Sequence, residues 1–438
     1  MAGDEVASEL SSFLESGIYR FPSQNAIFMD PVRVLNDSYT RFKISPSAYY
    51  SRFCDSSLKE EGRDAVRVSS GSSARRKKRK RRIHELNQRE ISAEKRHQAT
   101  RPFLLRAHEE FLVANDLLSF LCNLKRDGCG SVGNKDSSPV GKDTGPSFVD
   151  LGCTWQAPLY EMSLYCCADD NHIDDKGTQL VQCGEGMVVQ AFNNLFVNES
   201  SDDKVAEFLS HWYIIPRKSC FHMSDLGHIH ELIPVQSADG FNLIVIDPPW
   251  ENGSAHQKSV YPTLPNRYFL SLPVKQLTHT RGALVALWVT NREKLWVFVE
   301  KELFPAWGIT NATLLYWLKV KADGSLIGEL DLFHHRPYEC LLLGYSYGKG
   351  TDSEHQPAYK PLPGNQVLIS IPGHHSRKPP LGKMLSDYIP GPKPARCIEL
   401  FARELTAGWT SWGNEILHFQ ESRYFMNKFI NTTLKECC

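Results

Sequence analysis

Near-continuous apolar segments alternate with amphipathic stretches in the second half of the chain, from about Pro216 onwards. Apolar runs rich in β-branched residues predict strands buried on both faces, because a half-exposed strand would alternate apolar and polar residues. The expected strands are residues 243–246, 283–289, 313–318, 339–344, 366–371 and 396–401. Residues 291–304 have the spacing of an amphipathic helix. The pattern therefore predicts a sheet that helices cover on both faces.

This alternation predicts an α/β fold of the Rossmann-like, doubly wound kind, which we assign to residues 216–420. Such folds bind their ligands at the carboxyl ends of the strands. Residues that directly follow a predicted strand are therefore the first candidates for a functional site.

The first half of the chain is less regular. Residues 1–70 mix aromatic patches with Ser and Pro and predict a loosely folded arm. Residues 71–124 hold a basic run and then an N-terminal helical extension of two helices, with a break expected at Pro102 because proline removes a helix hydrogen bond. The other expectations are a flexible linker at residues 125–147, a small middle domain at residues 148–215 and a C-terminal tail at residues 421–438.

The composition is that of an average globular protein. The 438 residues are 41% hydrophobic and 23% charged, with 50 Lys and Arg against 50 Asp and Glu, which excludes a wholly disordered or fibrous protein. No apolar run approaches the roughly 18 residues of a membrane span, and the N-terminus does not resemble a secretory signal. The 12 cysteines form no C-x-x-C pair, so we expect reduced thiols and no metal site.

The balanced net charge hides one strongly basic segment. Eight consecutive residues are basic: Arg75, Arg76, Lys77, Lys78, Arg79, Lys80, Arg81 and Arg82. A run of one sign stays solvated and attracts polyanions or an import receptor. We expect nuclear import and a nuclear location, and direct contact with a phosphate backbone is compatible with the same run.

The tetrapeptide D-P-P-W, residues 247–250, follows the first strand of this domain directly. Transfer of a group to the exocyclic amine of a nucleobase needs the amine hydrogens to be held, and the Asp247 carboxylate can accept one of them. A carbonyl of the Pro248–Pro249 turn can accept the other, because proline fixes the direction of the backbone. Trp250 offers a flat face on which the base can stack, and Tyr261 could cover the opposite side.

The chain resembles a known family from roughly Pro216 to Phe419: the eukaryotic adenine-N6 methyltransferases with the D-P-P-W signature, called the MT-A family. The long N-terminal extension is most similar to that of a plant member of the methyltransferase-like protein 4 group. Other matching segments are L-W-V-T-N (287–291), W-L-K (317–319), H-H-R-P-Y-E-C (334–340), S-R-K-P (376–379) and I-E-L-F-A-R (398–403). The resemblance implies a methyltransferase domain with permuted motif order and S-adenosylmethionine as the methyl donor.

The resemblance also implies which residues contact this donor. Lys378 matches the lysine that reaches the methionine carboxylate, and Glu399 could accept hydrogen bonds from the ribose hydroxyls. The remaining positions implied in the donor cleft are Asp247, Phe401, Arg403, Asn414, Glu415, Cys220 and Phe221. Related bacterial enzymes carry a glycine-rich F-x-G-x-G turn after the last strand, whereas this chain has Phe401 followed by A-R-E-L. The donor has no phosphates, so it needs no cradle of glycine amides.

Two loops are expected to face the substrate, at residues 251–258 and 334–339. Our candidates for nucleic-acid contact are Lys258, His334 and Arg336. Glu339 and Ser376, which lie in the matching segments, complete the expected substrate-binding set.

These observations lead to the expectation of an enzyme that methylates N6 of adenine in RNA, with an adenosine held out of any helix. The resembled group implies 2′-O-methyladenosine in small nuclear RNA as the target, and DNA adenine is the alternative. Two other readings stay open, a catalytically silent RNA-binding scaffold and a methyltransferase for proteins or small molecules. We expect a monomer, because the N-terminal extension could cover the catalytic core in place of a partner.

Overall fold

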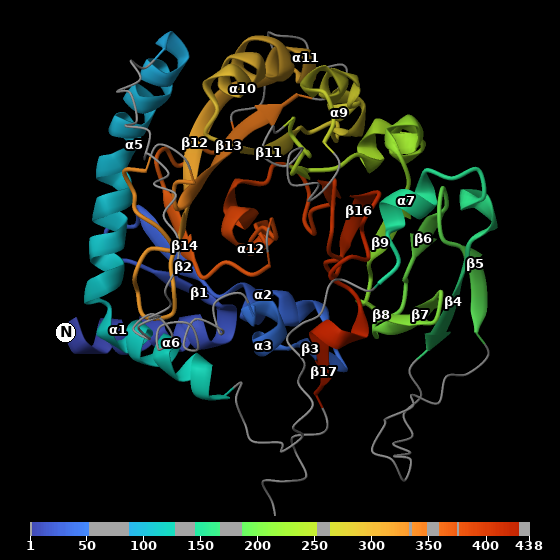
Figure 1. Ribbon diagram of the computed structural model, residues 1–438, viewed down its shortest axis with the longest axis horizontal. Helices are drawn as coiled ribbons and strands as arrows, with labels where there is room; N and C mark the ends of the chain where they lie inside the picture. Colours follow the sequence, from blue (N-terminus) through green and yellow to red (C-terminus); the bar gives the residue numbers. More distant parts are fainter. Residues whose placement is uncertain are drawn as a thin grey trace, which may run out of the picture.

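The computed structural model describes residues 2–51, 87–127, 145–166, 186–251, 263–332, 335–347, 359–374 and 376–428. Within these residues, one large mixed sheet organises the molecule (Figure 1). Its strand order is β1 (Ile18–Arg20), β2 (Ala26–Met29), β14 (Val367–Ser370), β12 (Ile309–Lys319), β13 (Tyr338–Ser346), β11 (Ala283–Val289), β10 (Leu243–Ile246), β15 (Cys397–Leu400), β16 (Trp409–Gly413), β9 (Cys220–Met223) and β6 (Leu195–Val197).

The sheet confirms the α/β fold and all six predicted strands, with ends that differ by a few residues. β10 runs parallel to β11 and β15, and the parallel arrangement continues through β16 to β9. β13 lies antiparallel between β11 and β12, which makes the sheet mixed. The carboxyl ends of β10 and β15 therefore lie side by side at one edge, directly before Asp247 and Phe401.

Successive residues of the central strands enter two different cores, because side chains alternate across a strand. Ile244 and Ile246 of β10 pack in one core with Trp296 and Trp307, which belong to a nearly continuous helix. This helix comprises α10 (Glu293–Phe298), the π-helical turn η7 (Val299–Leu303) and α11 (Phe304–Trp307), and it confirms the helix expected from the sequence. Leu243 of β10 packs in the other core, together with residues of α12 (Gly382–Leu385).

The expected loosely folded arm is wrong for residues 2–51. These residues form α1 (Ala2–Ser16), β1, β2, α2 (Pro31–Leu35), β3 (Phe42–Ile44) and α3 (Pro46–Tyr49). β2 pairs in parallel with β14, with Ile27 opposite Leu368. The aromatic residues that suggested loose structure are buried instead, for example Phe28, whose ring stacks on Phe111 at 5.4 Å between centroids.

The break expected at Pro102 is also wrong, because α5 (Gln88–Val113) continues through it and the chain breaks at Ala114 before α6 (Asn115–Asp127). A proline inside a helix costs about 3 kcal/mol, so tertiary contacts must offset this cost. Leu104 and Phe111, both on α5, are buried in the same core as Ile244 and Ile246 of β10, which is called the main core below. Figure 1 shows α5 as a long helix along one flank of the molecule.

The middle segment forms its own antiparallel sheet, in the order β5 (Met187–Gln190), β4 (Glu161–Cys166), β7 (Lys204–Phe208) and β8 (His211–Ile215), preceded by α7 (Phe148–Gly152). The segment is not separate from the main sheet, because β6 pairs with β9. The expected C-terminal tail is likewise wrong for residues 421–428, where β17 (Phe425–Asn427) pairs with β3.

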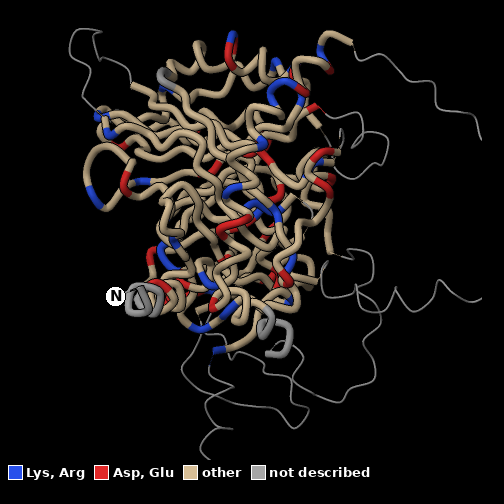
Figure 2. The backbone as a smooth tube through the Cα atoms, turned by 90° about the vertical axis from the view of Figure 1, so that its left-hand side faces the viewer, with Lys and Arg blue, Asp and Glu red and all other residues tan. Residues whose placement is uncertain are grey.

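The predictions that fall wholly or mostly outside the described part of the chain are the basic run at 75–82, the flexible linker at 125–147, the loop at 251–258 with Lys258, Tyr261 and His334. Basic and acidic positions are interspersed along the described backbone (Figure 2). None of the helices described here is both long and apolar enough to cross a membrane.

Candidate active site

Asp247 lies at the carboxyl end of β10, where the sequence predicts the chemistry. Its backbone N–H donates to the Leu400 carbonyl at 3.3 Å, which fixes the residue against β15. Its side chain is paired as well, because Lys378 Nζ donates to Asp247 Oδ2 at 3.0 Å. Burial raises the pKa of Asp247, and the Lys378 ammonium opposes this rise.

Lys378 is shared between two carboxylates. Its Nζ lies 3.4 Å from Glu339 Oε2, and Glu339 pairs in turn with Lys319. Burial alone would raise the pKa of Glu339, but the two lysines lower it to about 2. The cluster therefore alternates charges in the order Asp247, Lys378, Glu339, Lys319. Charge alternation of this kind keeps partly buried ions paired and limits their desolvation cost.

A cavity of about 410 Å³ opens beside this cluster. Six of the predicted site residues line it: Asp247, Ser376, Lys378, Glu399, Phe401 and Arg403. The Glu399 carboxylate makes no hydrogen bond or ion pair to another residue in the described part of the chain. Burial, with help from the Asp247 and Glu404 carboxylates, raises its pKa to about 8. A half-buried carboxylate that faces a cavity is suited to accept hydrogen bonds from hydroxyl groups of a ligand.

The other residues implied in the donor cleft are placed differently. Glu415 does not line the cavity, but its Oε2 lies 3.1 Å from Arg403 Nε and so holds a residue that does. Asn414 is exposed beside it. Cys220 and Phe221 lie on β9, outside the cavity lining, and Phe221 is buried in a separate core against Phe196.

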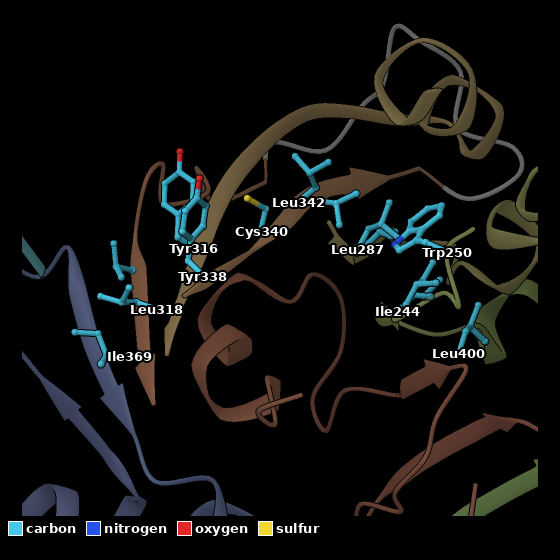
Figure 3. Packing of buried hydrophobic residues seen from close by; sticks show 14 of the residues in the cluster. Ile244, Trp250, Leu287, Tyr316, Leu318, Tyr338, Cys340, Leu342, Ile369 and Leu400 are labelled. Carbon is cyan, nitrogen blue, oxygen red and sulfur yellow. The ribbon is translucent and has the colours of Figure 1, made fainter. Parts of the chain in front are cut away.

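Trp250 differs from the expectation of an open stacking face. Its side chain is only 6% exposed and its indole N–H donates to the Trp288 carbonyl at 2.8 Å. The ring meets Phe269 edge to face at 5.0 Å, and Figure 3 shows it beside Leu287 in the main core. Trp250 therefore anchors the D-P-P-W loop to the core in this structure.

The two proline carbonyls of the loop are both engaged by the chain itself. Pro248 accepts from the Trp250 N–H at 2.7 Å, and Pro249 accepts from the Leu264 N–H at 3.0 Å. A carbonyl has a second lone pair, so either oxygen can still accept a substrate hydrogen. The turn is held in one conformation by these bonds.

Arg336 is not an open nucleic-acid contact in this structure. Its guanidinium is 5% exposed and pairs with Glu94 of α5 at 2.6 Å, and its Nε donates to the Leu332 carbonyl. The neighbouring Tyr338 hydroxyl lies 3.0 Å from Nδ1 of His97, also on α5. Helix α5 therefore holds the segment that leads into Glu339.

Sequence reasoning missed several residues of the site. Lys319 stands in the W-L-K segment quoted for the resemblance and ends a strand, and these two signals could have identified it. Four residues around α2 also line the cavity, and no local signal marks them: Val34, Leu35, Asp37 and Ser38. The described residues hold no group of three His, Cys, Asp or Glu side chains arranged to bind a metal ion.

The Rossmann-like sheet carries a cavity of acidic, basic and aromatic side chains at its strand ends, where such folds bind their ligands. Similarity to known proteins identifies the class as methyltransferases that use S-adenosylmethionine. The MT-A70 family model matches residues 241–415. The mouse N(6)-adenine-specific methyltransferase METTL4 is 38% identical over 238 residues, which are 53% of this chain and 49% of the mouse protein. The human protein of the same name is 32% identical over 431 residues, which are 96% of this chain and 86% of the human protein.

The chain therefore belongs to the MT-A70 family and is a METTL4-like adenine-N6 methyltransferase. Two further relatives carry names that specify a nucleic acid. The N6-methyladenosine RNA methyltransferase MTA1 of Pyricularia oryzae is 36% identical over 207 residues, covering 45% of this chain and 53% of that protein. The DNA N6-methyl methyltransferase of Caenorhabditis elegans is 33% identical over 226 residues, covering 49% and 55%.

The cavity residues fit this methyl donor. Lys378 would hold its carboxylate, and the Glu399 carboxylate, which has no partner among the described residues, would accept hydrogen bonds from its ribose hydroxyls. When bound, the donor supplies a methyl group on a sulfonium that is already reactive. The chain's task is therefore to hold the acceptor amine and to exclude water.

Proposed function

We propose that this chain methylates N6 of adenine in RNA, and that its target is 2′-O-methyladenosine in small nuclear RNA. The product would be N6,2′-O-dimethyladenosine. The observation that carries the proposal is the position of Asp247 at the edge of the donor cavity, beside Lys378 and Glu399. This arrangement brings a carboxylate that can hold an amine next to groups that fit the donor.

Asp247 acts on the target amine by accepting one of its hydrogens. The nitrogen lone pair of adenine N6 is delocalised into the ring, and a hydrogen bond that holds the N–H directs this lone pair toward the methyl group. Positioning of this kind can supply about 7 to 11 kcal/mol of the barrier reduction at its upper range. Lys378 pairs with both Asp247 and Glu339, so charged groups already surround the Asp247 carboxylate before the substrate binds.

Two observations support RNA as the substrate. The Pyricularia relative is named as an RNA methyltransferase, and the extension resembles that of the methyltransferase-like protein 4 group. The basic run at residues 75–82 suits the phosphate backbone of either nucleic acid. The Caenorhabditis relative is named as a DNA methyltransferase, so DNA is the alternative that the experiment must include.

The test is methyl transfer from labelled S-adenosylmethionine by the purified chain. The substrates are matched RNA oligomers with adenosine or 2′-O-methyladenosine at one position, and a DNA oligomer of the same sequence. We expect the strongest labelling of the 2′-O-methyl RNA, and no labelling with Asp247→Ala. A preference for DNA would replace this proposal, and donor binding without transfer to any oligomer would contradict a self-sufficient enzyme.

We also propose that the enzyme works as a monomer in the nucleus. The monomer is supported by α5 and β2, which cover the catalytic core from within the same chain. Sedimentation with and without RNA tests it, and a concentration-dependent dimer would contradict it.

The nuclear location rests on the basic run, which would bind an import receptor. Deletion of residues 75–82 should shift a fluorescent fusion to the cytoplasm, and unchanged nuclear accumulation would contradict the proposal.

A further inference from the structure

Arg377, the residue before Lys378, is buried against the cavity by three groups from three parts of the chain. Its side chain is 2% exposed and forms a two-pronged ion pair with Glu404. Its guanidinium carbon lies 4.2 Å from the centroid of the Tyr49 ring and 4.4 Å from that of Phe419. The cation is therefore held between two aromatic faces as well as by a carboxylate.

This ion pair connects the two loops that form the donor cavity. Ser376 to Lys378 follow β14, and Phe401 to Glu404 follow β15. Ser376 and Phe401 both have left-handed backbone conformations, with φ of 65° and 63°. Residues other than glycine adopt this region at a cost that the surrounding structure must offset. The Arg377–Glu404 pair is the contact that joins the two loops close to these positions.

The N-terminal segment takes part in the same contact. Tyr49 comes from α3, and Ser38 Oγ accepts from the Ala407 N–H at 3.2 Å on the loop after Glu404. Lys383, beyond Lys378, pairs with Asp37. Residues 34–49 therefore contact both loops of the cavity, about 330 positions away in sequence from Lys378.

We propose that Arg377 is a positioning residue for the methyl donor, and that it makes the N-terminal segment part of the donor site. By fixing its neighbour Lys378 and the Arg403–Glu404 loop, Arg377 sets the distance between the groups that hold the two ends of the donor. The rings of Tyr49 and Phe419 contact the guanidinium of Arg377, and cation–π contacts of this kind hold it in place. This inference rests on the donor site assigned above.

Loss of the Arg377–Glu404 ion pair would disturb the loop that carries Phe401 and Arg403. A buried Glu404 that loses Arg377 becomes an unpaired charge, and it must either take up a proton or draw water into the loop. Either response moves the loop that carries Phe401 and Arg403. Hydrogen bonds weaken steeply as donor and acceptor atoms move apart, so a shift of this loop weakens the binding of the methyl donor.

The experiment measures donor binding by titration calorimetry and steady-state kinetics for four variants of the full chain. Arg377→Lys keeps the charge but not the two-pronged geometry, and Tyr49→Leu leaves the ion pair but removes one aromatic face. We expect the Kd and KM for S-adenosylmethionine to rise about tenfold in both, with kcat at saturating donor and the KM for RNA within about twofold. Arg377→Met combined with Glu404→Gln leaves no unpaired charge and should bind the donor better than Arg377→Met alone.

Arg396→Met is the matched control, because Arg396 is an exposed arginine just before the opposite end of β15. It should leave donor binding unchanged. A role limited to folding predicts a lower Tm without a change in donor Kd, and this result for Arg377→Lys and Tyr49→Leu would overturn the inference. Lys378→Met tests the assigned donor site separately from the positioning role of Arg377. If this variant also leaves the donor Kd unchanged, the assigned donor site itself is wrong.

Discussion

Lys378 donates a hydrogen bond to Asp247 across 3.0 Å, so the residue expected to hold the donor and the residue expected to hold the acceptor amine are each other's partners. A ligand carboxylate that competes for Lys378 would reduce this pairing. Asp247 would then have more capacity to accept a hydrogen from the amine. The geometry therefore couples donor binding to the capacity of the Asp247 carboxylate to accept a hydrogen from the amine.

Asp247→Asn should remove transfer while leaving the donor site nearly intact. The amide keeps the shape of the side chain but loses the negative charge, so we expect transfer to fall by at least about 100-fold. Lys378 keeps Glu339 as a second partner at 3.4 Å, so the donor Kd should stay within a few-fold. Single-turnover transfer and calorimetry measure the two quantities. A large loss of donor binding in this variant would contradict the role assigned to Asp247.

Glu399 predicts a dependence of stability on pH. Its pKa is about 8 in the folded chain and 4.5 in the unfolded chain, so between these values the folded state binds more protons. The free energy of unfolding contributed by Glu399 is therefore fully present below pH 4.5 and is lost as the pH rises to about 8. Glu399→Gln does not titrate, so its Tm should fall less than that of the wild type between pH 5 and pH 9. Parallel Tm curves for the two proteins would refute the raised pKa.

The same group predicts how donor binding changes with pH. The carboxylate form of Glu399 is the stronger acceptor for ribose hydroxyls, so donor affinity should increase as the pH rises through about 8. Glu399→Gln should bind the donor more weakly and lose this pH dependence. Calorimetric titrations with S-adenosylmethionine at several pH values provide the measurement. An affinity that falls with rising pH would contradict the assignment.

Trp250 should be mainly a stability determinant. Its ring is buried in the main core and its N–H has a backbone partner, so Trp250→Ala should lower the free energy of unfolding by about 3–5 kcal/mol. Trp155 is 81% exposed, and Trp155→Ala is a control that should change stability by no more than about 0.5 kcal/mol. Urea denaturation of both variants tests the prediction. A stable Trp250→Ala protein with weak RNA binding would instead support an open stacking role.

The central strands could be predicted from the sequence because local composition marks them. β10 and β11 are buried along their whole length and read as continuous apolar runs. β1 and β2 have only three and four residues, and they become strands through pairing with each other and with β14, far along the chain. The helix break predicted at Pro102 is wrong because the packing of α5 against distant segments outweighs the local effect of the proline.

Some residues of the candidate site could likewise be predicted from the sequence, and others could not. Asp247 directly follows a strand, and Lys378 and Glu399 fall in segments that resemble the family, so the sequence identifies them. Val34 and Tyr49 reach the donor cavity and its supporting ion pair only through the folded N-terminal segment, and no local pattern marks them. Contacts between distant segments decide which side of a residue is buried, as at Trp250, and one sequence does not contain that information.

Arg336 provides a final test that separates an internal ion pair from a phosphate contact. The guanidinium is paired with Glu94 inside the protein, so Arg336→Met should weaken RNA binding by loosening the segment before Glu339. The dependence of log K on log salt concentration should then keep its wild-type slope. A lost phosphate contact would instead reduce the magnitude of the slope by about 0.7 for a single strand.

Glu94→Gln is the matched variant, because it breaks the same pair from the other side without removing a cation. We expect it to raise the KM for RNA by a factor similar to that of Arg336→Met. The double variant should show little further change, since the two residues share one interaction. Additive effects combined with a reduced salt slope for Arg336→Met would place Arg336 on the RNA backbone and would contradict the pairing with α5 in the working enzyme.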